Sequence, residues 1–532
     1  MSSTVATLKK FGFYVACRVL CRTLELLSFL MSLLFSEKRS AVPVIDDHNL
    51  VTPAVKLSQQ IKEGHITSEE VVESFIARIK RINPLINAVV DDRFERALKE
   101  AREIDKKLAD ARNNEGDPSI LKLPLVGVPV SIKETISVED QSFTGGLLTR
   151  KLVKAPKTAD AVALLMKNGL IPIASTNVPE LAMWWDCSNP VYGQTNNPYD
   201  LSRIPGGSSG GEAALISSAG SVIGVGNDIA GSIRMPCNFC GIFGHKPTPF
   251  VVSNNGGFPS CKGDREKLLG MGPMVRYAVD MVPMLKIMAG AKAEKLKLDL
   301  PVDLGKLRIF YIEDLGDPLA SSCNQDIIEG LHAAISHFVK KHKTPVEKVT
   351  LDELRHGLFL WSAEANKDAV NPTLAQQFGD GDGELNPVVE VVKKTLNCSN
   401  YSMNSIAATA LDKIGPDTDS TSNKILNAKA DELRRKFNDL VGDDGVLLVP
   451  THPEPAPKHY TTLLKIFNIS YTSVTTVLLG PITQCPLGMS KEGLPFGVQV
   501  IAKPYNDRLT LAVAMELEKA CGGWTAPCRI DL

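Results

Sequence analysis

Apolar and polar positions follow two periods along this chain, one typical of helices and one of strands. After Thr67-Ser-Glu-Glu70, which has the residues of a helix-capping box, apolar residues recur three and four positions apart, so we expect an amphipathic helix that ends at Pro84. The same spacing predicts helices over 159–168, capped by Thr158, and over 327–339. Short apolar runs predict buried strands at 126–132, 171–174, 221–225, 445–449 and 497–502.

Strands and helices therefore alternate along most of the chain, which is typical of the α/β class. Because the strand segments come from distant parts of the sequence, we expect one mixed central sheet covered by helices, in a single large catalytic domain over residues 41–532. Residues 292–440 are more polar and helical in pattern, so within this domain we expect them to form a helical insertion.

Residues 11–35 form an apolar stretch that, at about 1.5 Å per residue in a helix, can cross about 30 Å of hydrocarbon. Arg18, Arg22 and Glu25 interrupt it, and a charge at the centre of a membrane helix costs roughly 2.5–3.5 kcal/mol. No small-residue cleavage site follows Phe35, which argues against a signal peptide. We therefore expect a hydrophobic helix that makes residues 1–40 a membrane-anchor segment. It would either span an intracellular membrane once or lie peripherally on it, and a buried first helix is the alternative.

Composition excludes several classes of protein. Hydrophobic residues make up 44% and charged residues 22%, which is ordinary for a globular chain and excludes collagen, coiled coil and disorder as the main architecture. Lys and Arg total 59 against 60 for Asp and Glu, so there is no basic excess to bind nucleic acid. The eleven cysteines lack zinc-type spacing, because the C-x-x-C pair Cys237 and Cys240 has no second pair and no nearby histidines. We expect no metal site and no disulfide framework.

Two glycine-rich turns are the strongest candidates for chemistry. Pro205-Gly-Gly-Ser-Ser-Gly-Gly211 precedes an apolar segment, which suits a loop that leads into a helix N-terminus with free N–H groups. A phosphate loop would end in Gly-Lys-Ser or Gly-Lys-Thr, whereas here Glu212 follows Gly211. A second turn, residues 226–236, follows one helix-strand unit later, so the two turns are expected to build one site.

These motifs resemble the amidase-signature family. The resemblance is carried by GGSSGG at 206–211, DIAGSIRMP at 228–236 and Lys133 on a predicted strand, with Ser208 75 positions after Lys133 and Ser232 24 positions after Ser208. It continues through Thr176-Asn-Val-Pro179, Asp186-Cys-Ser-Asn-Pro190, Gly244-His-Lys-Pro247, Gly480-Pro-Ile-Thr483 and Gly493-Leu-Pro-Phe-Gly497. Together with the hydrophobic N-terminus, the pattern is similar to the fatty-acid amide hydrolases of that family over nearly the whole chain.

The resemblance implies a single amidase-signature domain in which a Ser–cis-Ser–Lys triad hydrolyses amides without a metal or cofactor. Ser232 would be the nucleophile, Ser208 would relay its proton through a loop with a cis Gly207–Ser208 bond, and Lys133 would be the base. A base must be neutral, so burial has to lower the pKa of Lys133 from its usual value near 10.4.

In the same family, consecutive backbone N–H groups stabilise the oxyanion. Here they would be those of Ile229, Ala230, Gly231 and Ser232. Ala230 stands where glycine is usual, so if the turn requires a positive φ there, its Cβ would cost roughly 1 kcal/mol and lower activity.

Four further residues are expected to support the site. Ser209 would form hydrogen bonds within it, and Asp228 and Arg234 would fix the second turn. Asn227 stands where Thr or Ser is more common and would serve the turn equally well.

The anchor and the resemblance together predict long-chain fatty-acid amides, both primary amides and ethanolamides, as substrates taken from the bilayer. Ala182, Met183, Trp184 and Trp185 follow the Thr176–Pro179 turn and are candidates for an acyl channel, with plain core packing as the alternative. The expected partners are lipid amides, a membrane and a second copy of the chain in a homodimer, and not nucleic acid.

Three other functions compete. Gly206–Gly210 also fits the G-x-S-x-G elbow of α/β-hydrolase esterases, with Ser208 as nucleophile and His452 as base, although no strand pattern precedes Ser208. A non-catalytic membrane protein that binds lipid amides would explain Ala230 in the oxyanion turn. A soluble amidase, such as an amidotransferase subunit, is opposed by the hydrophobic N-terminus.

Overall fold

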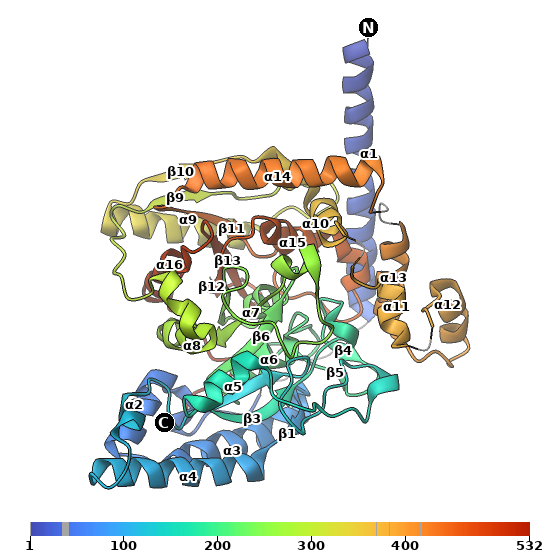
Figure 1. Cartoon of the computed structure of the whole chain (residues 1–532). Coiled ribbons are helices and arrows are strands. Elements are labelled where there is room, and N and C mark those ends of the chain that lie inside the picture. The colour runs from blue at the N-terminus through green and yellow to red at the C-terminus, as the bar shows by residue number, and fades with distance from the viewer. Residues whose placement is uncertain (1, 35–41, 369, 382, 415–417) are drawn as a thin grey trace.

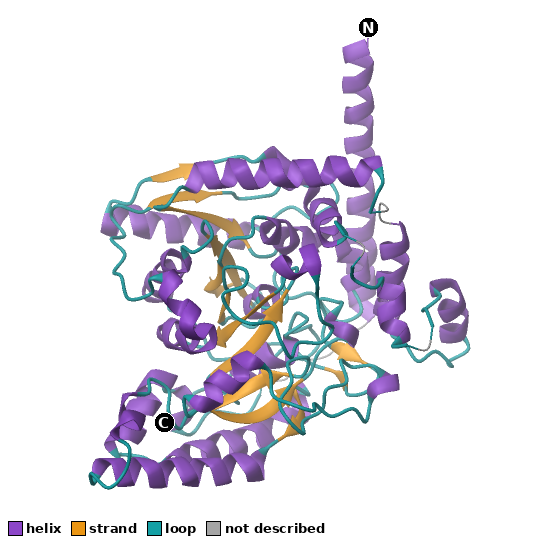
Figure 2. Ribbon diagram, in the orientation of Figure 1, coloured by secondary structure: helices purple, strands orange, loops and turns teal. Residues whose placement is uncertain are grey.

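The structure, a computed structural model, describes residues 2–34, 42–368, 370–381, 383–414 and 418–532. One mixed sheet of eleven described strands runs through the molecule, with helices on both sides of it (Figures 1 and 2). Its order from edge to edge is β1-β3-β2-β6-β8-β7-β12-β13-β11-β9-β10. Parallel pairing joins β2 to β3 and β6, and β9 to β10 and β11, while the central strands pair antiparallel. The expected α/β fold with a mixed central sheet is therefore confirmed.

The strands are β1 (Val89–Asp92), β2 (Pro129–Lys133), β3 (Ile171–Thr176), β4 (Ser188–Asn189), β5 (Gly193–Gln194), β6 (Ile223–Asp228), β7 (Phe243–Lys246), β8 (Gly270–Val275), β9 (Arg308–Tyr311), β10 (Val346–Lys348), β11 (Gly445–Pro450), β12 (Ile482–Met489) and β13 (Pro495–Ile501). The helices are α1 (Ser2–Leu34), α2 (Ala54–Glu63), α3 (Ser68–Ile86), α4 (Phe94–Arg112), α5 (Asp160–Lys167), α6 (Gly210–Ser217), α7 (Arg234–Phe239), α8 (Met281–Ala289), α9 (Gln325–His337), α10 (Gly357–Ala365), α11 (Leu374–Gly379), α12 (Pro387–Thr395), α13 (Met403–Ile414), α14 (Thr421–Val441), α15 (Ser470–Val477) and α16 (Asp507–Cys521).

Local sequence signals explain several of these boundaries. The predicted capping box is present at α3, where Thr67 and Glu70 bond reciprocally, so two N–H groups at the helix start have partners. The expected stop at Pro84 is wrong by two residues, because α3 runs on to Ile86 and ends at Asn87 in the left-handed region. Thr158 does not cap α5, since its hydroxyl accepts from the N–H of Glu139 instead.

The segment 292–440 differs from the expected helical insertion. It contains α9 to α14, but it also contributes β9 and β10 to the main sheet, where β9 pairs in parallel with β11. A parallel pair needs a crossover, and here the long segment between β9 and β11 supplies it, with α14 lying across these strands at the top of Figure 1. The expected boundary between residues 40 and 41 lies outside the described residues.

The N-terminal helix α1 forms as expected, and part of it extends beyond the body of the molecule (Figure 1). None of the helices in the described ranges is long and apolar enough to span a membrane. The interrupting charges make specific contacts instead. Arg18 donates to the Ala320 carbonyl and to Ser322 Oγ, both at 3.1 Å, and Arg22 pairs with Glu25 at 2.8 Å.

Candidate active site

The site forms where two parallel neighbouring strands end at the same edge of the sheet. β2 ends at Lys133 and β6 ends at Asp228, and their register pairs Ile132 with Val225. The loop before α6 approaches the same edge, because the Ser209 N–H donates to the Ser232 carbonyl at 3.1 Å. The two glycine-rich turns therefore meet, as the sequence predicted.

Lys133 lies in the interior, with none of its surface exposed. Its Nζ is 2.7 Å from Ser208 Oγ and donates to Asn227 Oδ1, also at 2.7 Å. Burial lowers the pKa of Lys133 to about 7, although the negative charges of Asp228 and Glu212 act in the opposite direction. Near neutral pH a substantial fraction of this amine is therefore uncharged and able to accept a proton.

Glu212 is a buried carboxyl group beside this strand that the sequence reasoning did not single out. Its Oε2 accepts from Thr176 Oγ1 at 2.6 Å, and its Oε1 accepts from Ser131 Oγ. Burial raises the pKa of Glu212 to about 7. It connects β2, β3 and α6, so it fixes the strand that carries Lys133 relative to the loop that carries Ser208.

The Gly207–Ser208 peptide bond is cis, as the resemblance implied. Ser208 is buried and in contact with Lys133, whereas Ser232 is half-buried and its hydroxyl has no hydrogen bond to any described residue. Ser209 hydrogen-bonds within the site through its main-chain N–H, which donates to Ser232, whereas its buried Oγ has no partner among the described residues.

In the predicted oxyanion turn, residues 229–232, the positive φ lies at Gly231 and not at Ala230. Gly231 has φ +132°, and a Cβ there would lie 2.3 Å from Thr472 Oγ1, whereas Ala230 has no positive φ. The Gly231 N–H is also engaged, since it donates to Asp228 Oδ1 at 2.8 Å. Of the four predicted donors, the N–H groups of Ile229, Ala230 and Ser232 donate to no group in the described part of the chain.

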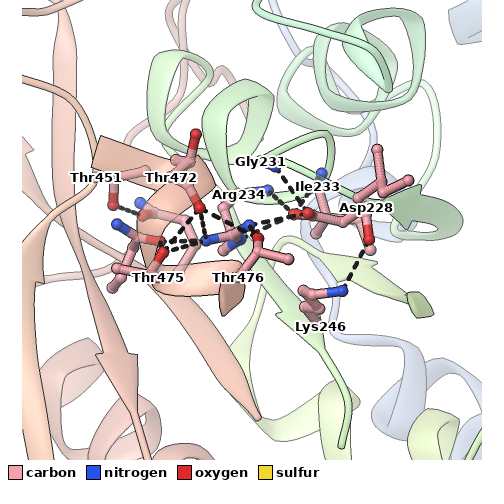
Figure 3. Close-up of polar contacts among 12 residues, drawn as sticks. Asp228, Gly231, Ile233, Arg234, Lys246, Thr451, Thr472, Thr475 and Thr476 are labelled. Carbon is pink, nitrogen blue, oxygen red and sulfur yellow. Dashed lines mark hydrogen bonds and ion pairs between the residues drawn. The ribbon is translucent and has the colours of Figure 1, made fainter. Parts of the chain in front are cut away.

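Asp228 and Arg234 form a fully buried ion pair that shapes this turn (Figure 3). Arg234 Nε donates to Asp228 Oδ2 and its Nη2 to Asp228 Oδ1, both at 2.9 Å. The remaining guanidinium donors bind the Thr472 carbonyl, Thr475 Oγ1 and Thr476 Oγ1 on α15, together with Gln499 Oε1 on β13. The pair thus ties the turn to α15 and β13, in agreement with its predicted supporting role.

The four candidate channel residues have different surroundings. Trp185 is buried in a small cluster with Ile204 and Phe239, so it is core. Trp184 is half-buried and donates through Nε1 to Thr462 Oγ1 at 3.0 Å. Ala182 and Met183 are half-buried, and Met183 packs against a separate apolar cluster that includes Leu181, Phe378 and Leu385.

The esterase alternative is not supported. No strand leads into Ser208 in the structure, and the basic group in contact with its hydroxyl is Lys133. His452 instead lies between the rings of Trp185 and Phe239, where burial lowers its pKa to about 4.

One set of described side chains has metal-binding chemistry, formed by His337, His342 and Glu516, whose ligand atoms lie within 4.8 Å of one another. Lys341 Nζ donates to Glu516 Oε1 at 2.8 Å, and Lys519 Nζ lies 3.6 Å from Glu516 Oε2. These ammonium groups already neutralise the carboxylate and would repel a cation, and none of these residues contacts the Lys133–Ser208 pair.

Comparison with known proteins agrees with this geometry. The sequence model of the Amidase family matches residues 70–511. The chain therefore belongs to the amidase-signature family of serine hydrolases. Within that family it is 44% identical to fatty-acid amide hydrolase 2-B of Danio rerio over 493 residues, which cover 91% of this chain and 92% of that protein. It is 42% identical to human fatty-acid amide hydrolase 2, over 90% of each chain.

A solved structure of fatty acid amide hydrolase shares the fold, with a TM-score of 0.71 at 23% identity over 90% of this chain and 86% of that one. The chain is thus an amidase-signature serine hydrolase of the fatty-acid amide hydrolase 2 type, and the non-catalytic alternative is set aside.

The substitutions Gly231→Ala and Ala230→Gly, at neighbouring positions of the oxyanion turn, should differ sharply in their effect on activity. Gly231→Ala forces a Cβ into Thr472 at an unfavourable φ, so we expect kcat to fall by about a hundredfold or more, as when an oxyanion donor is lost. Ala230→Gly removes an unstrained methyl group, so kcat/KM should stay within about twofold of wild type. Steady-state kinetics and thermal melting of both variants measure this. A folded Gly231→Ala enzyme with wild-type kcat would contradict the assignment of the turn.

Proposed function

We propose that this protein hydrolyses long-chain fatty-acid amides, both primary amides and N-acylethanolamines, to a fatty acid and an amine. The contact between buried Lys133 and Ser208 Oγ is the observation that carries the chemistry. The similarity to the two fatty-acid amide hydrolase 2 proteins supports the substrate class.

Acylation begins with two coupled proton transfers. Neutral Lys133 accepts the Ser208 proton while Ser208 accepts the proton of Ser232, and the Ser232 oxygen attacks the amide carbonyl carbon. The low pKa of Lys133 supports this role, since a lysine with an ordinary pKa would be protonated at neutral pH.

The tetrahedral intermediate carries a negative oxygen that needs donors held in place beforehand. The unengaged N–H groups of Ile229, Ala230 and Ser232 are the candidates, and the Asp228–Arg234 pair keeps their turn rigid. As the intermediate collapses, protonated Lys133 returns a proton through Ser208 to the departing amine. Water, activated by the same relay in its neutral state, then hydrolyses the acyl-enzyme.

Association with a membrane is the second part of the proposal. α1 exposes a row of large apolar side chains, among them Phe29 at 60% and Leu33 at 57% exposure, and α12 exposes Val388 and Val392. An exposed apolar area of this extent marks a lipid or protein contact, and the lysines at the end of α12 favour an anionic surface. We propose that these helices hold the enzyme peripherally on an intracellular membrane, from which it takes its substrates.

A chain-length series tests the substrate class. If the acyl chain enters an apolar site, kcat/KM for primary amides should rise by up to about fourfold per added CH₂, the equivalent of about 0.8 kcal/mol, from acetamide towards octadecanamide. Ser232→Ala is the control and should be inactive with an unchanged melting curve, and a fluorophosphonate should label Ser232 and not Ser208. A flat profile would indicate a small-substrate amidase, and an active Ser232→Ala would exclude the mechanism.

The pH dependence tests the role of Lys133. Only the neutral amine is a base, so kcat/KM should increase as pH rises through about 7, the pKa of Lys133, and then level off. Lys133→Ala should abolish this increase and should slow amides more than matched esters, because an amine leaving group needs the returned proton more. Equal losses on the two substrates would show that Lys133 is not the proton donor.

Co-sedimentation with anionic lipid vesicles tests membrane association. The double substitution Phe29→Asp and Leu33→Asp should reduce the bound fraction several-fold, since each charge must leave the lipid interface. Leu152→Asp is the matched control, because Leu152 is 85% exposed but lies on neither α1 nor α12. Equal binding of all three proteins would exclude α1 as the attachment surface.

A further inference from the structure

The oxyanion turn accepts a hydrogen bond from the long segment between β9 and β11. The carbonyl oxygen of Ile229 accepts from the indole Nε1–H of Trp361 at 2.8 Å, although the two residues are 132 positions apart. Trp361 lies on α10, within the region where the sequence indicated only a helical insertion. A side chain from outside the signature motifs therefore contacts the backbone of the candidate oxyanion hole.

This contact fixes the direction of a catalytic N–H group. In a trans peptide, the carbonyl oxygen and the following N–H point in opposite directions. By holding the Ile229 oxygen, Trp361 sets the plane of the Ile229–Ala230 peptide and directs the Ala230 N–H away from α10. That N–H has no partner in the described part of the chain, so it is available to a substrate oxygen.

The rest of the turn is fixed by other groups. Asp228 accepts from the N–H groups of Gly231 and Ile233, at 2.8 and 3.1 Å. Neither bond restrains the Ile229–Ala230 peptide. Without the indole, this peptide could rotate and turn its carbonyl towards the site, where an oxygen would repel the oxyanion instead of stabilising it.

α10 is a rigid support for this contact. Gly357 packs so closely on α15 that an added Cβ would lie 3.0 Å from the Cβ of Ser470, and Leu360 is fully buried. α15 also carries the threonines that bind Arg234. The two ends of the turn are thus held by two helices that pack against each other.

We propose that Trp361 is a positioning residue that aligns the Ala230 N–H in the oxyanion hole through its indole N–H. This inference takes its substrate class from the proposed function. Its test does not depend on that class, because phosphonylation of Ser232 uses the same oxyanion hole whichever amide the enzyme hydrolyses.

The experiment compares Trp361→Phe with Trp524→Phe in the full-length protein. Trp524 Nε1 also donates to a backbone carbonyl, that of Ser217 at 3.1 Å, so the control loses the same kind of bond elsewhere. Loss of one oxyanion donor costs about 100- to 1000-fold in kcat, so misalignment of one should lower kcat by about tenfold or more. The rate of Ser232 phosphonylation by a fluorophosphonate should fall in parallel, and Trp524→Phe should keep both rates.

The pattern of losses separates positioning from other effects. A misaligned hole should slow amides and matched esters equally, leave KM within about threefold, and leave the pH midpoint unchanged, unlike the loss of Lys133. Unchanged phosphonylation and kcat in a folded Trp361→Phe protein would overturn the proposal, as would a selective loss on amides. Absence of any Ser232 labelling in wild type would instead refute the proposed function.

A second variant tests the proposal if Trp361→Phe fails to fold. Replacement of Trp361 by 3-benzothienylalanine, through an expanded genetic code, exchanges the indole N–H for sulfur and keeps the shape of the ring. The proposal expects the same parallel loss of kcat and phosphonylation with a wild-type melting curve. Wild-type rates in this variant would show that the ring packs without positioning the turn.

Discussion

The buried Asp228–Arg234 ion pair is the interaction on which the site depends. Moving two charges out of water is expensive, and the pair is maintained because all three guanidinium nitrogens and both carboxylate oxygens have partners. Removing one partner from such a pair typically costs about 3–5 kcal/mol. These bonds join the end of β6, the start of α7, α15 and β13. The shape of the oxyanion turn therefore depends on this ion pair, and neither Asp228 nor Arg234 can be replaced without leaving a buried charge unpaired.

The same pair makes a neutral lysine compatible with its surroundings. Asp228 is the largest charge that opposes the low pKa of Lys133, and an unpaired carboxylate there would favour the protonated amine. Arg234 binds both carboxylate oxygens of Asp228, and buried Lys246 donates to the Asp228 main-chain carbonyl at 2.9 Å. With that charge compensated, burial dominates and the pKa of Lys133 falls to about 7. The Asp228–Arg234 pair thus both shapes the turn and keeps the Asp228 charge from raising the pKa of Lys133.

The sequence predicted what is local and missed what is distant. The strands at β2, β3, β6, β11 and β13 are visible as apolar runs, and motif spacing brought Lys133, Ser208 and Ser232 to one edge. β9 and β10 were missed because they are short strands inside a polar segment, whose place in the sheet is set by long-range pairing. The contacts of Asn227 and Trp361 join elements with no sequence signal in common. The concern about Ala230 was wrong because the positive φ belongs to the glycine after it.

The N-terminal helix shows how the same residues can be interpreted in two ways. Arg18 interrupts the apolar run and weakens a spanning helix, yet in the structure it helps to join α1 to the catalytic body, through Ala320 and Ser322. Arg18 thus faces protein, whereas large apolar side chains such as Phe29 and Leu33 face outward, the reverse of a helix packed in a soluble core. Because Arg18 holds α1 on the catalytic body, the exposed apolar side chains stay available for the proposed contact with lipid. Such a surface suits the proposed peripheral attachment, because long-chain amides partition into a membrane and not into water.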